Sequence, residues 1–227
     1  RACVNAAVSA GARKVYLIEE PVAAALGAGL DLSVPRGRFI LDMGGGTTDI
    51  AVLSLNGIVC KKSIKLAGRK LDEAIVRCVR TDRNVLIGEK MAERIKIEVG
   101  SVFYTEDKEM EAKGRNLHTG LPEKFVIRTS DIYDALMEQV MQIVTAVQQI
   151  LEITPPELSA DIWEDGLIMT GGGALLHGLG DLISQHAKIK VRLAEHPVEC
   201  VAIGTALSFS KLDELYDGFV TPSTHTH

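Results

Sequence analysis

The chain has 227 residues, a length that fits one or two domains with a sizeable hydrophobic core. Hydrophobic residues make up 46% of it and charged residues 24%, the composition of an ordinary globular protein, and no apolar run reaches the roughly 18 residues of a membrane span. The net charge of -5 comes without a basic patch, so the sequence does not indicate a nucleic-acid-binding protein.

Two further features of the sequence concern its redox state and its start. The four cysteines (Cys3, Cys60, Cys78 and Cys200) are widely spaced in apolar surroundings and form no CxxC pair. We therefore expect reduced thiols in the core of a cytosolic protein.

The chain opens at Arg1 in a pattern typical of the middle of a helix, and we expect it to be a fragment of a longer protein.

The first part of the chain alternates helices with strands. We expect a helix over 1–10, a strand over Lys14–Ile18, a helix over Pro21–Gly29 and a strand over Arg38–Asp42. This alternation predicts an α/β fold with partly parallel strands. The helix that begins at Pro21 consists of small residues, so it can pack closely against another backbone.

A hairpin with a glycine-rich loop follows. Strands Arg38–Asp42 and Asp49–Leu55 flank the loop, and Asn56-Gly57 is a strong two-residue turn signal that leads into a strand over Ile58–Leu66. The hairpin therefore encloses the glycine-rich loop between its first two strands.

The middle of the chain, from 68 to about 151, has a mostly helical pattern. Apolar residues recur at four-residue spacing at Leu71, Ile75 and Val79, and again at Met91, Ile95 and Val99. Two strand-like stretches, Glu109–Lys113 and Lys124–Arg128, interrupt this pattern. We expect Ser130 to cap a long amphipathic helix whose apolar stripe runs to Leu151 and which ends at Pro155-Pro156.

The last part returns to alternating elements. We expect a strand over Gly166–Thr170, a helix from Ala174, a short strand over Val191–Ala194, a helix from Val198 to Tyr216 and a disordered tail over 221–227. This order suggests an α/β subdomain formed by 28–67 together with 155–205. A smaller, more helical subdomain over 68–154 would be inserted between its halves.

The strongest chemical signal is the glycine-rich loop. Three glycines, Gly44, Gly45 and Gly46, leave backbone N–H groups unshielded, and such groups bind anions when they line a concave turn. Thr47 and Thr48 add hydroxyl donors, and Asp42 would act on a phosphate through Mg²⁺ and its waters. The alternative is a glycine-rich turn that binds nothing.

Three weaker signals leave alternatives open. Gly171, Gly172 and Gly173 precede an expected helix, which suits an anion or close approach to a nucleoside. Glu20, held before Pro21, either orients a water molecule for attack on a phosphate or only complements the helix dipole. The polar residues of 93–98 are either a solvated helix face with ion pairs or part of a site.

Four motifs then occur in the order of a known family: "LIEEPVAAALGAG", "ILDMGGGTTDIAV", "AERIKIEVGS" and "LIMTGGGALL". Along essentially the whole chain they resemble the MreB-type bacterial actins, within the superfamily of actin, chaperone ATPases and sugar kinases. The resemblance implies an actin-like ATPase (ribonuclease H-like) fold. It also implies that 1–27 is the remnant of a first domain with an interdomain helix, and that 206–227 is a C-terminal helix and tail.

The resemblance also implies roles for particular residues, with ATP and Mg²⁺ as cofactors. Gly44 to Thr48 would be a phosphate loop, Asp42 would serve the metal, and Glu20 would position the attacking water. The nucleoside would be bound by Glu93, Arg94, Ile95 and Lys96, with Glu93 and Lys96 beside the base and ribose, and by an adenosine loop of Gly171, Gly172, Gly173, Ala174 and Leu175.

The family assignment carries expectations for the whole protein. Its members form filaments with their own copies under the cytoplasmic membrane and act with the cell-wall elongation machinery in maintaining rod shape. The family's first phosphate loop has no counterpart in this chain, so we expect ATPase activity of the intact protein and not of the fragment. Asp49 stands where the family commonly has Glu. The alternatives are a chaperone ATPase, a sugar kinase or a remnant that binds no nucleotide.

Overall fold

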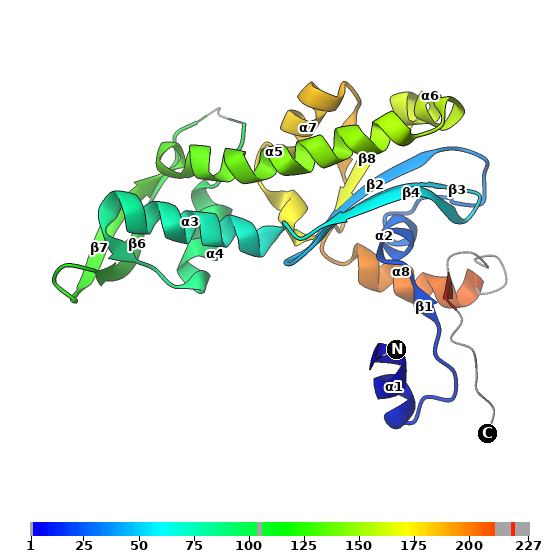
Figure 1. Cartoon of the computed structure of the whole chain (residues 1–227), viewed down its shortest axis with the longest axis horizontal. Helices are drawn as coiled ribbons and strands as arrows, with labels where there is room; N and C mark the ends of the chain where they lie inside the picture. The colour runs from blue at the N-terminus through cyan, green and yellow to red at the C-terminus, as the bar shows by residue number, and fades with distance from the viewer. Residues whose placement is uncertain (1, 104–105, 212–218, 221–227) are drawn as a thin grey trace.

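The computed structural model describes residues 2–103, 106–211 and 219–220, with backbone only for 211 and 219–220 (Figure 1). The α-helices are α1 (Ala2–Ser9), α2 (Glu20–Gly27), α3 (Gly68–Arg83), α4 (Glu89–Val99), α5 (Thr129–Ile153), α6 (Pro156–Asp165), α7 (Leu179–Ala187) and α8 (Cys200–Ser208), with short 3₁₀ turns η1 (Gly172–Leu175) and η2 (Phe209–Lys211). The strands are β1 (Leu17–Ile18), β2 (Arg38–Met43), β3 (Thr48–Ser54), β4 (Gly57–Ile64), β5 (Val85–Leu86), β6 (Glu109–Asn116), β7 (Pro122–Arg128), β8 (Leu167–Thr170), β9 (Val191–Leu193) and β10 (Phe219–Val220).

A mixed sheet in the order β4-β3-β2-β8-β9 organises the larger part of the molecule. Strand β2 pairs antiparallel with β3 and parallel with β8, and β8 pairs parallel with β9. The prediction that the strands near 38–42, 49–55 and 58–66 share one sheet is therefore confirmed. The prediction of an α/β fold with partly parallel strands is confirmed as well.

Helices cover both faces of this sheet. In Figure 1, α5, α6 and α7 lie on one side of the strands and α2 and α8 on the other. Because side chains alternate along a strand, Phe39, Leu41 and Met43 belong to the hydrophobic cluster on the α5 side. Ile40, between them, packs in a second cluster with Val22 and other residues of α2. The side chains of β2 are thus divided between two cores.

The crossing of α2 and α8 is close enough to require glycine on both helices. A Cβ atom at Gly27 would overlap the carbonyl group of Cys200, and one at Gly204 would overlap the carbonyl group of Ala23. The small residues of the helix that begins near Pro21 therefore allow close backbone packing, as predicted from the sequence.

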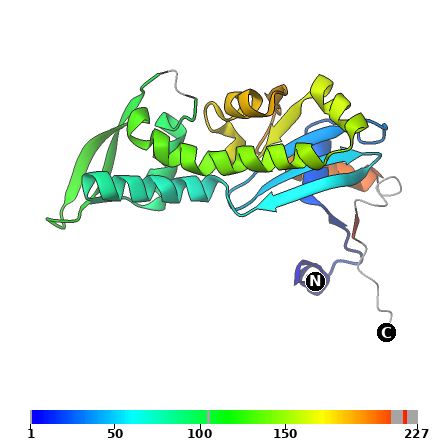
Figure 2. The same ribbon diagram turned by 45° about the horizontal axis from the view of Figure 1, so that its top comes forward.

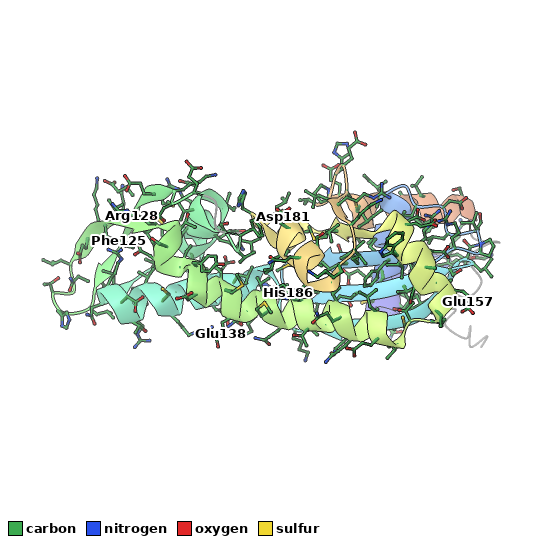
Figure 3. All side chains as sticks on the ribbon, turned by 90° about the horizontal axis from the view of Figure 1, so that it is seen from above. Phe125, Arg128, Glu138, Glu157, Asp181 and His186 are labelled. Atoms are coloured by element: carbon green, nitrogen blue, oxygen red, sulfur yellow. The ribbon has the colours of Figure 1, made fainter. Side chains whose placement is uncertain are left out.

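A smaller sheet, in the order β5-β6-β7, lies at the far end of the molecule. Helices α3 and α5 run side by side from the larger sheet to the smaller one (Figure 2). From above, Phe125 and Arg128 mark the end with the smaller sheet, Glu157 on α6 marks the opposite end, and Asp181 and His186 of α7 lie between them (Figure 3). One hydrophobic cluster extends from Phe39 to Ile127, so the two sheets share a continuous core.

Several sequence predictions are wrong in detail. Strand β1 is limited to Leu17–Ile18, where β10 pairs with it, and does not include Lys14. The hairpin turn is formed by Leu55 and Asn56, with φ of 47° and 61°, because Ser54 pairs with Gly57. Residues at positive φ in both central positions define a type I′ turn, one residue earlier than predicted.

The two helix starts also differ from the prediction. Helix α5 begins at Thr129, and its N-cap Arg128 donates its N–H to the carboxylate of Asp131, while Ser130 binds Asp107 instead of capping. The predicted helix from Ala174 is a 3₁₀ turn, and α7 begins only at Leu179. The 3₁₀ turn ends at Leu176, whose ψ of 124° is extended, and Gly178, with φ of 79°, is the N-cap of α7.

Other elements were not predicted, and some predictions lie outside the described residues. Helix α6 and strands β5 and β10 had no clear signal in the pattern. The structure shows the predicted helix to Tyr216 as α8 and η2, as far as Lys211. The remaining 212–216 and the tail 221–227 lie outside the described residues.

The four cysteines are free, but Cys3 is exposed, so the expectation of a core thiol is wrong there. None of the helices in the described part of the chain has the length and apolarity of a membrane crossing.

Candidate functional site

Both glycine runs leave the same edge of the larger sheet. Asp42 of β2 is the register partner of Thr170 of β8, and the two strands are parallel. Gly44–Gly46 begin after the last residue of β2, and Gly171–Gly173 begin after the last residue of β8. Carboxyl ends of neighbouring parallel strands are the usual place for ligands in open α/β sheets.

The first glycine run offers backbone donors to solvent. Gly45 and Gly46 are exposed, and no acceptor for their N–H groups is found among the described residues. The carbonyl oxygens of Gly44 and Gly45 point the other way and accept hydrogen bonds from the N–H groups of Gly68 (3.2 Å) and Arg69 (2.9 Å) at the start of α3. The loop is thus fixed from behind and fits an anion in front.

A buried ion pair supports this loop from α4. Nζ of Lys96 donates to the carbonyl oxygen of Gly68 (3.1 Å) and lies 2.8 Å from Oδ1 of Asp72, and both charged side chains are only 13% exposed. Burial raises the pKa of Asp72, with hydrogen bonding to Lys96 acting against it and the charge of nearby Glu93 adding to the rise. Lys96 therefore lies beside the start of α3 that binds the glycine loop, and Glu93 is near enough to act on Asp72, which sequence reasoning did not identify.

The second glycine run packs against the strand that leads into the first. Gly171 has φ of 84°, and a Cβ atom there would overlap the carbonyl group of Met43. Gly173 meets the side chain of the same methionine, whereas Gly172 is exposed and has open space around it. Since η1 is a single 3₁₀ turn, this run does not supply the helix N-terminus that the sequence suggested for an anion.

Three carboxylates face a common region on the α2 side of the sheet. Asp42 and Asp49 are directly opposed in the β2–β3 register, and Glu20 stands at the first turn of α2. Desolvation by burial raises the pKa of Glu20, and the charges of Asp42 and Asp49 raise it further. The pairing of Asp49 with Asp42 places Asp49 in this group as well.

Asp42 itself is almost fully buried, at 3% exposure. Its Oδ1 accepts a hydrogen bond from the hydroxyl group of Thr170 at 2.6 Å. Burial raises the pKa of Asp42, the Thr170 hydrogen bond opposes that rise, and Asp49 adds to it. Carboxylate oxygens are ligands that Mg²⁺ accepts, but no three metal-binding side chains of the described residues lie close enough together to hold a metal ion directly, so a magnesium ion at this edge would be bound through water.

A cavity of about 640 Å³ opens beside these carboxylates. Glu20 and Asp49 line it, together with Glu19 and Lys61, which form an ion pair at 2.8 Å. Neither glycine run nor Asp42 belongs to the lining of this cavity. Asp42, Gly45 and Gly172 therefore lie at one sheet edge but do not line this cavity.

Some predicted site residues have their side chains engaged elsewhere. Thr48 is fully buried and its hydroxyl group donates to the carbonyl oxygen of Leu66 at 2.6 Å, so that hydroxyl group is not directed at a ligand. Ile95 is fully buried in the core, and Arg94 pairs with Glu98 on the exposed face of α4. Ala174 is buried, and Leu175 is exposed with no described contact to the loop.

The sheet order, the two glycine runs at one edge and the carboxylates beside them define an actin-like fold. Solved structures agree: MreB5 of Spiroplasma citri bound to AMPPNP superposes with a TM-score of 0.89 at 36% identity, over 94% of this chain and 64% of that one. A MamK double helical filament shares the fold at a TM-score of 0.69 and 21% identity, over 85% of this chain and 58% of that one.

Sequence comparison gives the family. Residues 1–217 match the MreB/Mbl protein family. The chain is 46% identical to cell shape-determining protein Mbl of Bacillus subtilis over 95% of its length, and 47% identical to cell shape-determining protein MreB of Escherichia coli over 94%. The chain belongs to the MreB/Mbl family. It spans 65% of the Mbl relative and 62% of the MreB relative.

Proposed function

We propose that this chain carries part of an ATP site and that the complete natural protein is a filament-forming ATPase that maintains cell shape. The observation that carries the proposal is the pair of exposed N–H groups of Gly45 and Gly46 at the sheet edge, without acceptors among the described residues. The nucleotides AMPPNP and ADP bound to MreB5 of Spiroplasma citri support it.

Each part of the edge has a proposed task. The N–H groups of Gly45 and Gly46 bind phosphate oxygens, with Gly44 and Thr47 completing the loop. Lys96 and Glu93 lie on the nucleoside side, and Gly171 to Leu175 approach the adenosine. Asp42 holds Mg²⁺ through water, and the metal ion supplies neutralisation of phosphate charge when it is bound.

Glu20 is proposed to orient the attacking water. Its carboxylate is exposed at the start of α2, next to the cavity that Asp49 and Lys61 also line. Because burial and neighbouring charges raise the pKa of Glu20, its carboxylate is a better proton acceptor than an ordinary surface Glu. Its position also leaves the glycine loop free to hold the phosphate.

Organisation and cellular role follow the family. We propose that 1–27 is a remnant of a first domain with an interdomain helix, that 28–67 and 155–205 form one α/β subdomain, and that 68–154 is inserted. Filaments of many copies would lie at the inner face of the cell membrane and work with the cell-wall elongation machinery. The names of the relatives, cell shape-determining proteins, support this role.

The catalytic proposal is tested by Glu20→Ala in the complete natural protein. ATP affinity should stay within about threefold, while single-turnover hydrolysis should fall by about 10²–10⁴-fold, the usual contribution of a positioned base. Glu19→Ala is the matched control, because Glu19 lines the same cavity but is engaged with Lys61. Unchanged hydrolysis in Glu20→Ala would leave the residue as a helix-entrance charge only.

A pH series adds an independent test. Asp49→Asn removes one of the charges that raise the pKa of Glu20. The rising limb of hydrolysis against pH should therefore move to lower pH in this variant. A limb that stays in place would show that a group other than Glu20 controls the rate.

A further inference from the structure

Arg69 lies directly over the glycine loop. It is the second residue of α3, is exposed, and its backbone N–H donates to the carbonyl oxygen of Gly45 at 2.9 Å. Its side chain turns back over the loop: Nε lies 3.6 Å from the position of a Cβ atom on Gly45, and an Nη atom lies 3.3 Å from that position on Gly46. The missing side chains of the two glycines leave room for the guanidinium group.

The charge of Arg69 is not used within the described part of the chain. Lys70 pairs with Glu73, and Asp72 pairs with Lys96, so the nearby carboxylates of α3 have other partners. No ion pair or side-chain hydrogen bond of Arg69 occurs among the described residues. A guanidinium group carries five N–H donors in a planar fork, and here they remain available to a ligand.

Donors from two different elements therefore lie next to each other. The N–H groups of Gly45 and Gly46 come from the β2–β3 loop, and the guanidinium group of Arg69 comes from α3. The first N–H groups of α3 are already bound to the loop carbonyls, so the helix N-terminus itself is not the donor. A planar fork beside two backbone donors is an arrangement that suits a phosphate group.

We propose that Arg69 binds the terminal phosphate of a nucleoside triphosphate held by the glycine loop, which rests on the nucleotide site proposed above. Lys96, which the proposed site puts on the nucleoside side, contacts Gly68, and Gly68 binds the first glycine of the loop, Gly44. The guanidinium group reaches the last one, Gly46. A nucleotide lying along the loop therefore presents its outermost phosphate to Arg69.

The test compares Arg69→Gln, Arg69→Lys and Lys70→Gln in the complete natural protein. Affinity for AMPPNP, ADP and inorganic phosphate is measured with Mg²⁺ by calorimetry, and folding is checked by thermal unfolding without ligand. Arg69→Gln should weaken AMPPNP about 10- to 100-fold, the value of a charge-assisted contact, and ADP less than about threefold. Arg69→Lys should fall between, because it keeps the charge but loses the fork. Lys70→Gln removes the same charge one residue away and should change neither affinity.

The outcomes separate this inference from the site on which it rests. If the natural protein binds neither nucleotide, the proposed site is wrong and the role of Arg69 falls with it. If it binds both and Arg69→Gln leaves AMPPNP unchanged, or weakens ADP equally, the site stands and Arg69 is not a reader of the terminal phosphate. If only inorganic phosphate depends on Arg69, the residue binds free phosphate, which also overturns the proposal.

Discussion

The two glycine runs of this chain look alike in sequence but differ in physical purpose. In the first, Gly45 and Gly46 are exposed and have negative φ, and an added Cβ atom would meet only the flexible side chain of Arg69, at 3.6 Å and 3.3 Å. In the second, Gly171 has φ of 84°, and a Cβ atom there would overlap the backbone of Met43. The first run needs glycine so that its N–H groups stay exposed. The second needs glycine because a side chain would overlap Met43.

The difference teaches that a glycine triplet can mark either a ligand or a close packing contact. Both runs follow strands that end at the same edge of the sheet. The first run begins directly after Met43, and the second packs against Met43. Substitutions in the first run should therefore alter binding with little change in stability. Substitutions in the second should alter stability first, and binding only as a consequence.

The largest expected effect is on binding, in Gly45→Val. Its β-branched side chain would occupy the phosphate position and deny the loop two N–H contacts, each worth about 1.5 kcal/mol or more. Together these correspond to a loss of ATP affinity of about 100-fold or more. Calorimetry gives the affinity, and urea unfolding should show a stability change below about 1 kcal/mol, since the new Cβ meets no atom closer than 3.6 Å. A variant that unfolds instead would remove the contrast between the two runs.

The next effect is on stability, in Gly171→Ala. The positive φ and the overlap with Met43 should each be unfavourable, and the sum should lower the free energy of unfolding by about 3 kcal/mol. Gly172→Ala is the matched control, because nothing lies within 4 Å of its added Cβ atom. The control should stay within about 1 kcal/mol of the natural protein. Equal destabilisation of both variants would contradict the packing explanation.

Two neighbouring threonines repeat the contrast inside the first loop. Thr48→Val leaves the carbonyl oxygen of Leu66 without its 2.6 Å partner and should cost about 1–2 kcal/mol of stability. Thr47→Val should leave stability unchanged but weaken ATP binding about tenfold, because its half-buried hydroxyl group remains a candidate phosphate donor. The reverse result, with binding lost only in Thr48→Val, would assign the phosphate contact to the buried hydroxyl group.

The smallest effect concerns Asp42→Asn and its dependence on pH. Burial raises the pKa of Asp42 in the folded state, so the folded protein holds this proton more tightly than the unfolded chain does. Stability from this group is therefore present at low pH and is lost as pH rises through the folded-state pKa. The Asn variant should be slightly more stable than the natural protein at neutral pH, and the difference should shrink on acidification.

Urea unfolding across a pH series measures this difference, and magnesium-dependent ATP binding measured in parallel should be weakened. Stability that is equal at every pH would mean that the Thr170 hydrogen bond fully offsets the burial of the carboxylate. Either result measures how much stability the buried charge of Asp42 costs. The binding measurement shows what that charge contributes to the ligand at the first glycine run.

Local sequence determined the elements and the loop chemistry. The apolar spacing of Leu71, Ile75 and Val79 predicted α3 because a helix places residues four apart on one face, and these three are buried. The turn signal at Asn56-Gly57 and the three glycines between two apolar strands predicted the hairpin and its glycine-rich loop. These features need only the period of the backbone and the absence of a side chain, so they can be read without the fold.

Only the tertiary structure decided which distant residues meet. Asp49 joins Asp42 through strand register, Asp72 pairs with Lys96 across two helices, and Arg69 reaches Gly46 because the loop carbonyls fix the start of α3. The helix expected from Ala174 was wrong because the backbone becomes extended at Leu176, with ψ of 124°, and α7 begins only after Gly178. The role of Gly171 depended on the neighbouring strand. Residues far apart in the sequence acquire such contacts only when the sheet brings them together, and no local periodicity encodes that pairing.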